Sequence, residues 1–143
     1  MKNVLKTLLI SCFSLTFISC GQKNNTSEST SDENSIYSDN GTTFTVTVSS
    51  SKYYIDEILT KSLTLKKGYT YYFDATDSTT NNHPLFIGTI STGGSYTYEY
   101  TSGVTKSRTT TETLTFIVPS DSPSTLYYNC GNHVSMGSSI TIM

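Results

Sequence analysis

Residues 63–74 read LTLKKGYTYYFD, two short alternating segments on either side of a Lys-Lys-Gly turn. Apolar residues take every second position from Leu63 to Leu65 and again from Tyr69 to Phe73. A period of about two residues places these side chains on one face of a β-strand, whereas an amphipathic helix would need a period of about 3.6. This stretch therefore predicts two strands joined by a tight turn.

The same kind of segment recurs on both sides of this stretch. Short apolar or alternating runs rich in Thr, Tyr, Val and Ile, the residues favoured on pleated surfaces, are Phe44–Val48, Leu85–Ile87, Tyr96–Tyr100, Leu114–Val118, Leu126–Cys130 and Ile140–Ile142. Turn residues separate them, and no helical period of useful length is present. The pattern predicts an all-β fold, a Greek-key β-sandwich of about seven or eight strands.

The first residues have the features of an export signal. A short basic region precedes an apolar segment, residues 7–18, that is too short to span a bilayer. Ser19-Cys20 then resembles the lipobox of bacterial lipoproteins, although Phe17 stands where that box usually has Leu. We therefore predict a lipoprotein signal peptide at 1–19 and a lipidated Cys20, with an ordinary cleaved signal or an uncleaved anchor as the alternatives.

The next segment is polar and acidic, and only the residues beyond it have the pattern of a folded domain. Residues 20–41 contain almost no apolar side chains, so we expect a lipidated cysteine followed by a disordered linker. Residues 42–143 are long enough for one compact domain and too short for two. The predicted location is the bacterial cell envelope, on the periplasmic side or the outer surface, with the lipid as the contact to the membrane.

The overall charge excludes one class of partner. The formal net charge is −2 and the pI is about 5.5. Binding to nucleic acid requires a concentrated basic face, because the phosphates dominate the affinity. We therefore expect no nucleic-acid partner.

Near the C-terminus, Cys130, His133 and Met136 follow one another with the spacing C-x2-H-x2-M. Two imidazoles and a thiolate in a near-trigonal plane, with a weak axial thioether, form a type 1 (blue) copper centre. The chain has two histidines, so the second imidazole must come from His83, far upstream in the run NNHPLF. The residues thus predict one copper ion bound by His83, Cys130, His133 and Met136.

Cysteine usage favours the same site. Cys12 lies in the predicted signal peptide and Cys20 would carry lipid, which leaves Cys130 without a disulfide partner in an exported protein. A buried, unligated Cys130 remains an alternative, because free cysteines are often buried. A zinc site is weaker because zinc has no use for a thioether. A Cys-His nucleophile would need an orienting third group and a cleft, neither of which is indicated.

The ligand loop and the final segment, residues 127–142, resemble the cupredoxins, the plastocyanin and azurin superfamily. The two-residue gaps on both sides of His133 look most like amicyanin. Residues 52–56, 63–74, 83–85 and 100–105 are also similar to cupredoxin-like domains of exported bacterial proteins, so that the likeness covers most of 43–143.

This resemblance implies a monomeric one-electron carrier, and not an enzyme, with equatorial His83, Cys130 and His133, axial Met136 and a transient redox partner. Cupredoxins commonly have Asn directly after the first histidine, where this chain has Pro84.

Three functions stay open from the sequence. The first is a membrane-tethered blue-copper electron carrier, in which Pro84, Val134 and Met136 form an apolar rim for the partner. The second keeps the same ligands for copper delivery, storage or sensing. The third is a metal-free adhesive or carbohydrate-binding sandwich, since rows of tyrosine on a sheet can form such surfaces.

Overall fold

The computed structural model describes residues 38–143, with side chains from residue 41 onward. The predictions for 1–19, for Cys20 and for most of the linker lie outside the described residues. Within the described part, every regular element is a strand except the short 3-10 helix η1 (Ser78–Thr80). No helix in that part is long and apolar enough to cross a membrane.

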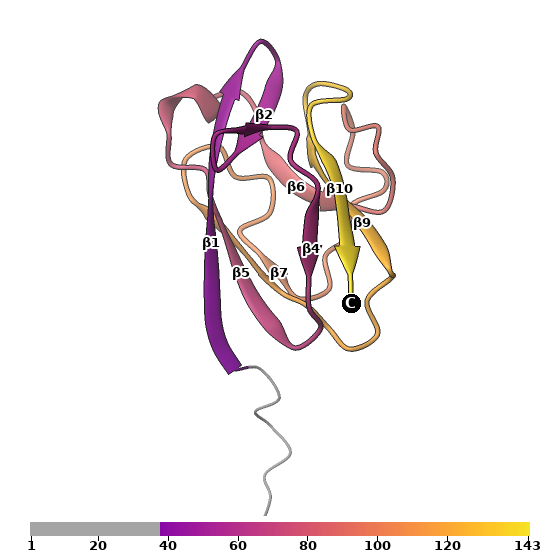
Figure 1. Cartoon of the computed structure of the whole chain (residues 1–143). Coiled ribbons are helices and arrows are strands. Elements are labelled where there is room, and N and C mark those ends of the chain that lie inside the picture. The colour runs from indigo at the N-terminus through magenta and orange to yellow at the C-terminus, as the bar shows by residue number, and fades with distance from the viewer. Residues whose placement is uncertain (1–37) are drawn as a thin grey trace, which may run out of the picture. The chain divides into compact units, whose positions relative to one another are not determined.

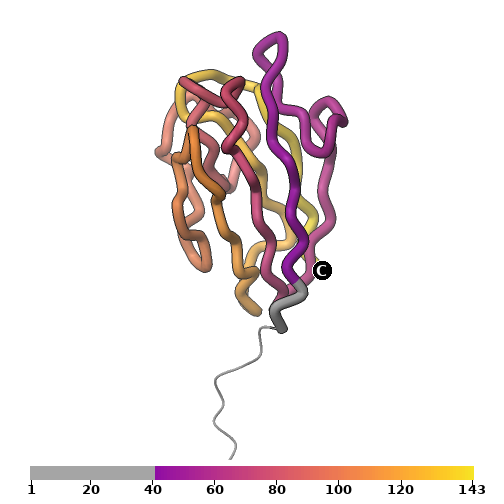
Figure 2. The backbone as a smooth tube through the Cα atoms, turned by 90° about the vertical axis from the view of Figure 1, so that its left-hand side faces the viewer, coloured from indigo at the N-terminus to yellow at the C-terminus, as the bar shows by residue number. Residues whose placement is uncertain are grey.

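The strands form two sheets that face each other (Figures 1 and 2). The first sheet has the order β3-β2-β1-β5-β8-β7, formed by Ile58–Leu59, Lys52–Ile55, Ser38–Ser49, Tyr69–Asp74, Thr113–Ile117 and Val104–Thr105. The second has the order β4-β10-β9-β6, formed by Leu63–Leu65, Ser138–Ile142, Thr125–Cys130 and Leu85–Gly88. The chain crosses repeatedly between the sheets, and β1 with β5 and β4 with β10 pair in parallel.

The two-residue period accounts for the core between the sheets. In β4 and β8 the burial alternates as the pattern predicted, with Leu63, Leu65, Leu114 and Phe116 inside. One continuous apolar cluster takes side chains from both sheets. Full burial of a large apolar side chain contributes about 1.5–3 kcal/mol, so this interior is the main support of the domain. The all-β sandwich is therefore confirmed.

The turn at Lys66–Gly68 is also confirmed. The Tyr69 N–H donates to the Lys66 carbonyl at 3.3 Å, and Gly68 has a φ of 80°, a conformation that glycine adopts at little cost. This turn directs β4, in the second sheet, back into β5, in the first.

The described residues contain ten strands where about seven or eight were predicted. The strands not predicted are β2, with four residues, and β3 and β7, which have only two residues each and carry no detectable period. β1 begins at Ser38, so residues 38–41 belong to a strand, whereas the sequence placed them in the linker. The predicted strand at Tyr96–Tyr100 is wrong. A turn closed by the Glu99 N–H on the Tyr96 carbonyl at 3.1 Å interrupts it, and only the bridge from Gly88 to Glu99 remains.

The two ends of the described domain lie beside the same turn. Ser38 pairs with Tyr69, while the Lys67 N–H donates to the Met143 carbonyl at 2.8 Å. In both views the loop after β9 lies at the opposite end of the molecule from the first residues of β1 (Figures 1 and 2). The loop with the proposed ligands therefore lies at the end of the sandwich opposite to Ser38 and Met143.

Candidate metal centre

The antiparallel pairing of β6 with β9 brings His83 to Cys130. Leu85 in β6 pairs with Cys130, the last residue of β9. The Gly131 N–H continues this contact by donating to the Pro84 carbonyl at 2.9 Å. His83 itself lies just before β6, in the turn after η1, and β6 is an edge strand of its sheet. Residues 47 positions apart thus become neighbours across a short ladder.

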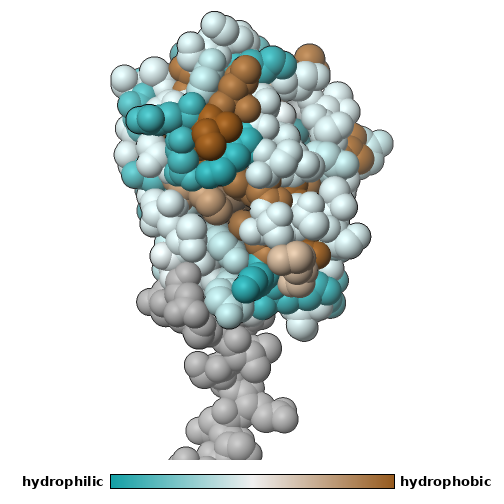
Figure 3. All heavy atoms as spheres, viewed as in Figure 1, coloured by the Kyte–Doolittle hydropathy of each residue, from teal (hydrophilic) through white to brown (hydrophobic). Residues whose placement is uncertain are grey.

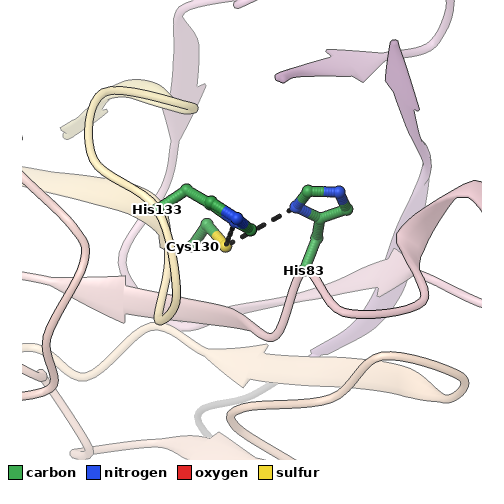
Figure 4. Close-up of side chains that lie close together, drawn as sticks. All are labelled: His83, Cys130 and His133. Atoms are coloured by element: carbon green, nitrogen blue, oxygen red, sulfur yellow. Dashed lines mark hydrogen bonds between the residues drawn. The ribbon is translucent and has the colours of Figure 1, made fainter. Parts of the chain in front are cut away.

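Cys130 Sγ faces a nitrogen of each imidazole ring, as the dashed lines of Figure 4 show. It is 3.6 Å from Nδ1 of His133 and 3.9 Å from Nδ1 of His83. The ligand atoms of these three residues all lie within 4.8 Å of one another. Both histidines therefore present the same ring nitrogen to the sulfur, which is the arrangement expected when three donors share one ion.

These separations fit a trigonal metal site. Metal–nitrogen bonds of about 2.0 Å and a metal–sulfur bond of about 2.3 Å at a trigonal angle give a nitrogen–sulfur separation of about 3.7 Å. The two values here, 3.6 and 3.9 Å, lie on either side of it. The donor set, two imidazoles and one thiol, is also the set that favours copper in this geometry.

Met136 closes the loop that begins at Cys130. Its side chain is 1% exposed and belongs to the same apolar cluster as Cys130. Its carbonyl accepts a hydrogen bond from the Tyr53 N–H at 3.0 Å, and Ser135 before it has a φ of 56° that turns the chain inward. Met136 is therefore held in the interior, in the same apolar core as the Cys130 side chain.

Exposure increases from the sulfur outward. Cys130 is fully buried, His83 is half-buried and His133 is exposed. Burial, and then the neighbouring His133, lower the pKa of His83 below its ordinary value of 6.5. Both effects favour the neutral imidazole of His83, which is the form that binds a metal.

The predicted apolar rim is only partly present. Val134 is 62% exposed beside His133 in the sequence, but Pro84 and Met136 are buried, and Met136 belongs to the apolar core. The loop residues next to His133, Asn132 and Ser135, are exposed and uncharged, but the Lys52 ammonium donates to the Ser135 carbonyl and brings a positive charge to this loop.

A second segment supports the ligand loop and was missed from the sequence. The Gly94 N–H donates to the Cys130 carbonyl at 2.8 Å, and the Ser135 N–H donates to the Thr92 carbonyl at 2.7 Å. Gly93 allows this approach, because a Cβ there would lie 2.9 Å from the Cys130 carbonyl oxygen. The Gly93-Gly94 pair was the available signal.

The tyrosines give little support to an adhesive face. Of those in residues 41–143, only Tyr98 is classed as exposed, and Tyr53, Tyr71 and Tyr128 are buried. The face shown in Figure 3 is largely polar with small separate apolar patches. The exposed large apolar side chains of the described part are Ile58, Leu59, Ile90, Tyr98, Val134 and Met143.

Comparisons with known proteins place the chain near one group of solved structures. No protein-family model matches the sequence, and no curated protein matches it. A reduced rusticyanin is similar at 14% identity and a TM-score of 0.45, over 75% of this chain and 82% of that one.

Two further solved structures give similar values. A structure described as the copper protein rusticyanin has 12% identity and a TM-score of 0.45, over 75% of this chain and 80% of that one. Rusticyanin from Thiobacillus ferrooxidans has 12% identity and a TM-score of 0.42 over the same shares. Because these scores are low, the function proposed next depends on the geometry of the site.

Proposed function

We propose that this chain is a type 1 copper protein of the cupredoxin kind that carries single electrons. One observation supports this above all others: a buried thiol lies 3.6 and 3.9 Å from two imidazole nitrogens supplied by distant parts of the chain. Copper in such a site supplies a one-electron couple. The short, amicyanin-like spacing around His133 agrees with this function. The similarity to solved structures is too weak to support it.

The chain's own contribution is to hold the donors still. Oxidised and reduced copper favour different geometries, so ligands that moved would slow each electron transfer. Cys130 is fixed by the β6–β9 ladder, and its carbonyl is bonded to Gly94. Burial of Cys130 and Met136 excludes water from two of the four donors. Both features favour rapid exchange over a labile, open copper site.

His133 is the proposed edge through which electrons enter and leave. It is the exposed ligand, with Val134 62% exposed beside it in the sequence and the Lys52 ammonium bonded to the Ser135 carbonyl of the same loop. Weak redox encounters bury small areas, and the few exposed residues of this loop suit a partner that must leave quickly. We propose that a transient redox partner docks over His133. We also propose that the carrier is a monomer.

We further propose export to the bacterial cell envelope and a membrane anchor made by lipid on Cys20. The motif at Ser19-Cys20 and the apolar segment before it support this proposal. Mass spectrometry of the membrane fraction checks it. Diacylglycerol on an N-terminal Cys20 is the expected result, and an unmodified N-terminus elsewhere would refute it.

Titration of the metal-free protein with copper tests the function. One equivalent of Cu(II) should produce an intense visible band from thiolate-to-copper charge transfer, and ascorbate should bleach it reversibly. Uptake without that band would favour copper delivery, storage or sensing, which need no fast redox. If the protein takes up no stoichiometric copper, the remaining alternative is a metal-free adhesive or carbohydrate-binding sandwich.

A pair of variants on one strand sharpens the titration. Cys130→Ser removes the thiolate and should abolish the band, whereas Thr125→Ser, on the exposed side of the same strand, should keep it. A band that survives in Cys130→Ser would show that the thiolate assignment is wrong.

A further inference from the structure

Three successive carbonyl groups around His83 each accept a hydrogen bond, two from the loop after Cys130 and one from Tyr53. The Asn82 carbonyl accepts from the Asn132 side-chain amide at 2.9 Å. The His83 carbonyl accepts from the Tyr53 hydroxyl at 2.7 Å, and the Pro84 carbonyl from the Gly131 N–H at 2.9 Å. Since a backbone segment outside a strand has no ladder to hold it, three such bonds in a row are a specific support.

The donors connect the His83 segment to the other ligands. Asn132 and Gly131 belong to the loop between Cys130 and His133, so their bonds tie one imidazole to the thiolate loop. Tyr53, in β2 of the other sheet, donates its hydroxyl to the His83 segment and its N–H to the Met136 carbonyl at 3.0 Å. A single buried tyrosine therefore joins the first and the last of the four proposed ligands.

The local sequence makes these bonds necessary. Pro84 has no N–H, so residue 84 contributes only its carbonyl to backbone bonding. Asn82 has a φ of 68°, and the His83 N–H is already used in the turn to the Thr80 carbonyl at 2.8 Å. The three carbonyls are thus what remains to fix the position of the His83 backbone relative to the loop.

Tyr53 is suited to the donor role. Its side chain is fully buried, so water does not compete for its hydroxyl. An ordinary tyrosine hydroxyl carries its proton at physiological pH and can donate to the His83 carbonyl.

We propose that Tyr53 and Asn132 are positioning residues that preform the metal site by holding the backbone of His83 against the cysteine loop. The inference rests on the proposed copper function for its purpose, but the preformed geometry itself belongs to the metal-free protein. Neither residue contacts the metal in this scheme. Both act through carbonyl oxygens, which leaves the His83 ring free to bind.

Amide hydrogen exchange of the metal-free protein tests the proposal without copper. Tyr53→Phe removes only the hydroxyl. Tyr128→Phe is the matched control, because Tyr128 is also buried and its hydroxyl donates to a backbone carbonyl, that of Lys61, at 3.0 Å. The reporters are the His83 and Gly131 amides, compared in each variant with the Ile142 amide, which bonds to Ser124 at 2.9 Å in another part of the fold.

The expected result is exchange at His83 and Gly131 about fivefold faster in Tyr53→Phe than in the control, the factor that corresponds to one net hydrogen bond. Asn132→Ala should also make exchange at His83 and Gly131 faster. Because Asn132 is exposed, this variant replaces Tyr53→Phe in the test if Tyr53→Phe fails to fold. The exchange rates of the His83 and Gly131 amides are taken relative to that of the Ile142 amide. If these relative rates are the same in Tyr53→Phe as in Tyr128→Phe, or the same in Asn132→Ala as in Tyr128→Phe, the proposal is overturned.

Removal of copper by a chelator provides the second measurement. Copper should leave Tyr53→Phe and Asn132→Ala several-fold faster than Tyr128→Phe. If exchange changes while these rates stay equal, the bonds support the fold alone and the positioning role is refuted. If even the wild-type chain takes up no copper, the proposed function fails, while the exchange experiment still decides whether the site is preformed.

Discussion

Gly137→Ala tests how closely the ligand loop is bound to the sheet. A Cβ at residue 137 would lie 1.7 Å from the Tyr128 carbonyl oxygen, whereas ordinary contact begins at 3.4 Å, so the two backbones must separate by 3.4 − 1.7 = 1.7 Å. Gly137 is not among the positive-φ residues, which means that alanine can adopt its backbone conformation and the effect is purely steric. No rotamer change relieves it, because the atom struck belongs to the backbone.

A separation of that size breaks the pairing of Ser138 with Tyr128 and moves Met136, the residue before Gly137. Overpacking costs about 1–3 kcal/mol and each lost hydrogen bond about 1 kcal/mol, so we expect a loss of at least about 3 kcal/mol. Urea denaturation at an unchanged m-value measures the loss, and the visible band of the copper form should weaken or shift.

Gly88→Ala is the control for this substitution. Its Cβ would meet first the Asn129 side-chain nitrogen at 2.9 Å, a much smaller overlap than the 1.7 Å approach at Gly137, so a cost of only about 1 kcal/mol is expected. If Gly137→Ala is as stable as Gly88→Ala and keeps the wild-type spectrum, the close approach of the loop to β9 is refuted.

Three further predictions concern the axial ligand, an ion pair and a hairpin. Met136→Leu conserves volume, so it should keep copper and raise the reduction potential in voltammetry, because loss of the thioether disfavours Cu(II); complete loss of metal would contradict an axial role. The pKa of Glu99 is lowered because hydrogen bonds from Arg108 and Ser107 outweigh its burial, so its carboxylate stabilises the fold above its ordinary value of 4.5 and loses that contribution as pH falls through the lowered folded-state pKa. Glu99→Gln should therefore be about 1 kcal/mol less stable than the wild type at pH 7, and acid denaturation curves should show this difference in unfolding free energy decreasing as the pH falls. A difference that does not change with pH would argue against the Glu99–Arg108 ion pair. Ser51→Gly should raise thermal stability by up to about 1 kcal/mol, because Ser51 has a φ of 57° in the β1–β2 turn, and a lower melting temperature would count against strain there.

The sequence was informative where one side-chain pattern determines one structure. The alternation in Leu63–Phe73 and in Leu114–Val118 predicted strands, since burial on one face requires that period. The spacing of Cys130, His133 and Met136 placed three donors on one loop, and the presence of only two histidines identified His83. Each of these predictions used residues that act locally or are too few to allow a choice.

The features that the sequence could not provide depend on partners distant in the chain. The segment Tyr96–Tyr100 has the period of a strand but does not form one. The Arg108 guanidinium lies 4.1 Å from the centre of the Tyr96 ring, and Phe86 packs against the same ring. The local sequence pattern does not encode these contacts. The bond from the Tyr53 hydroxyl to His83 spans 30 residues and depends on the packing of both sheets. Two-residue strands such as β3 and β7 are too short to carry any period.

The placement of both domain ends beside the Lys66–Gly68 turn has a practical consequence for handling the protein. β1 has 12 residues and spans about 40 Å, so an attachment made before Ser38 or after Met143 is separated from His133 by roughly the length of the sandwich. A domain fixed to an electrode or a bead through either terminus would therefore present its ligand loop to the solution. Oriented immobilisation needs no engineered surface cysteine, which would compete with Cys130 for the metal.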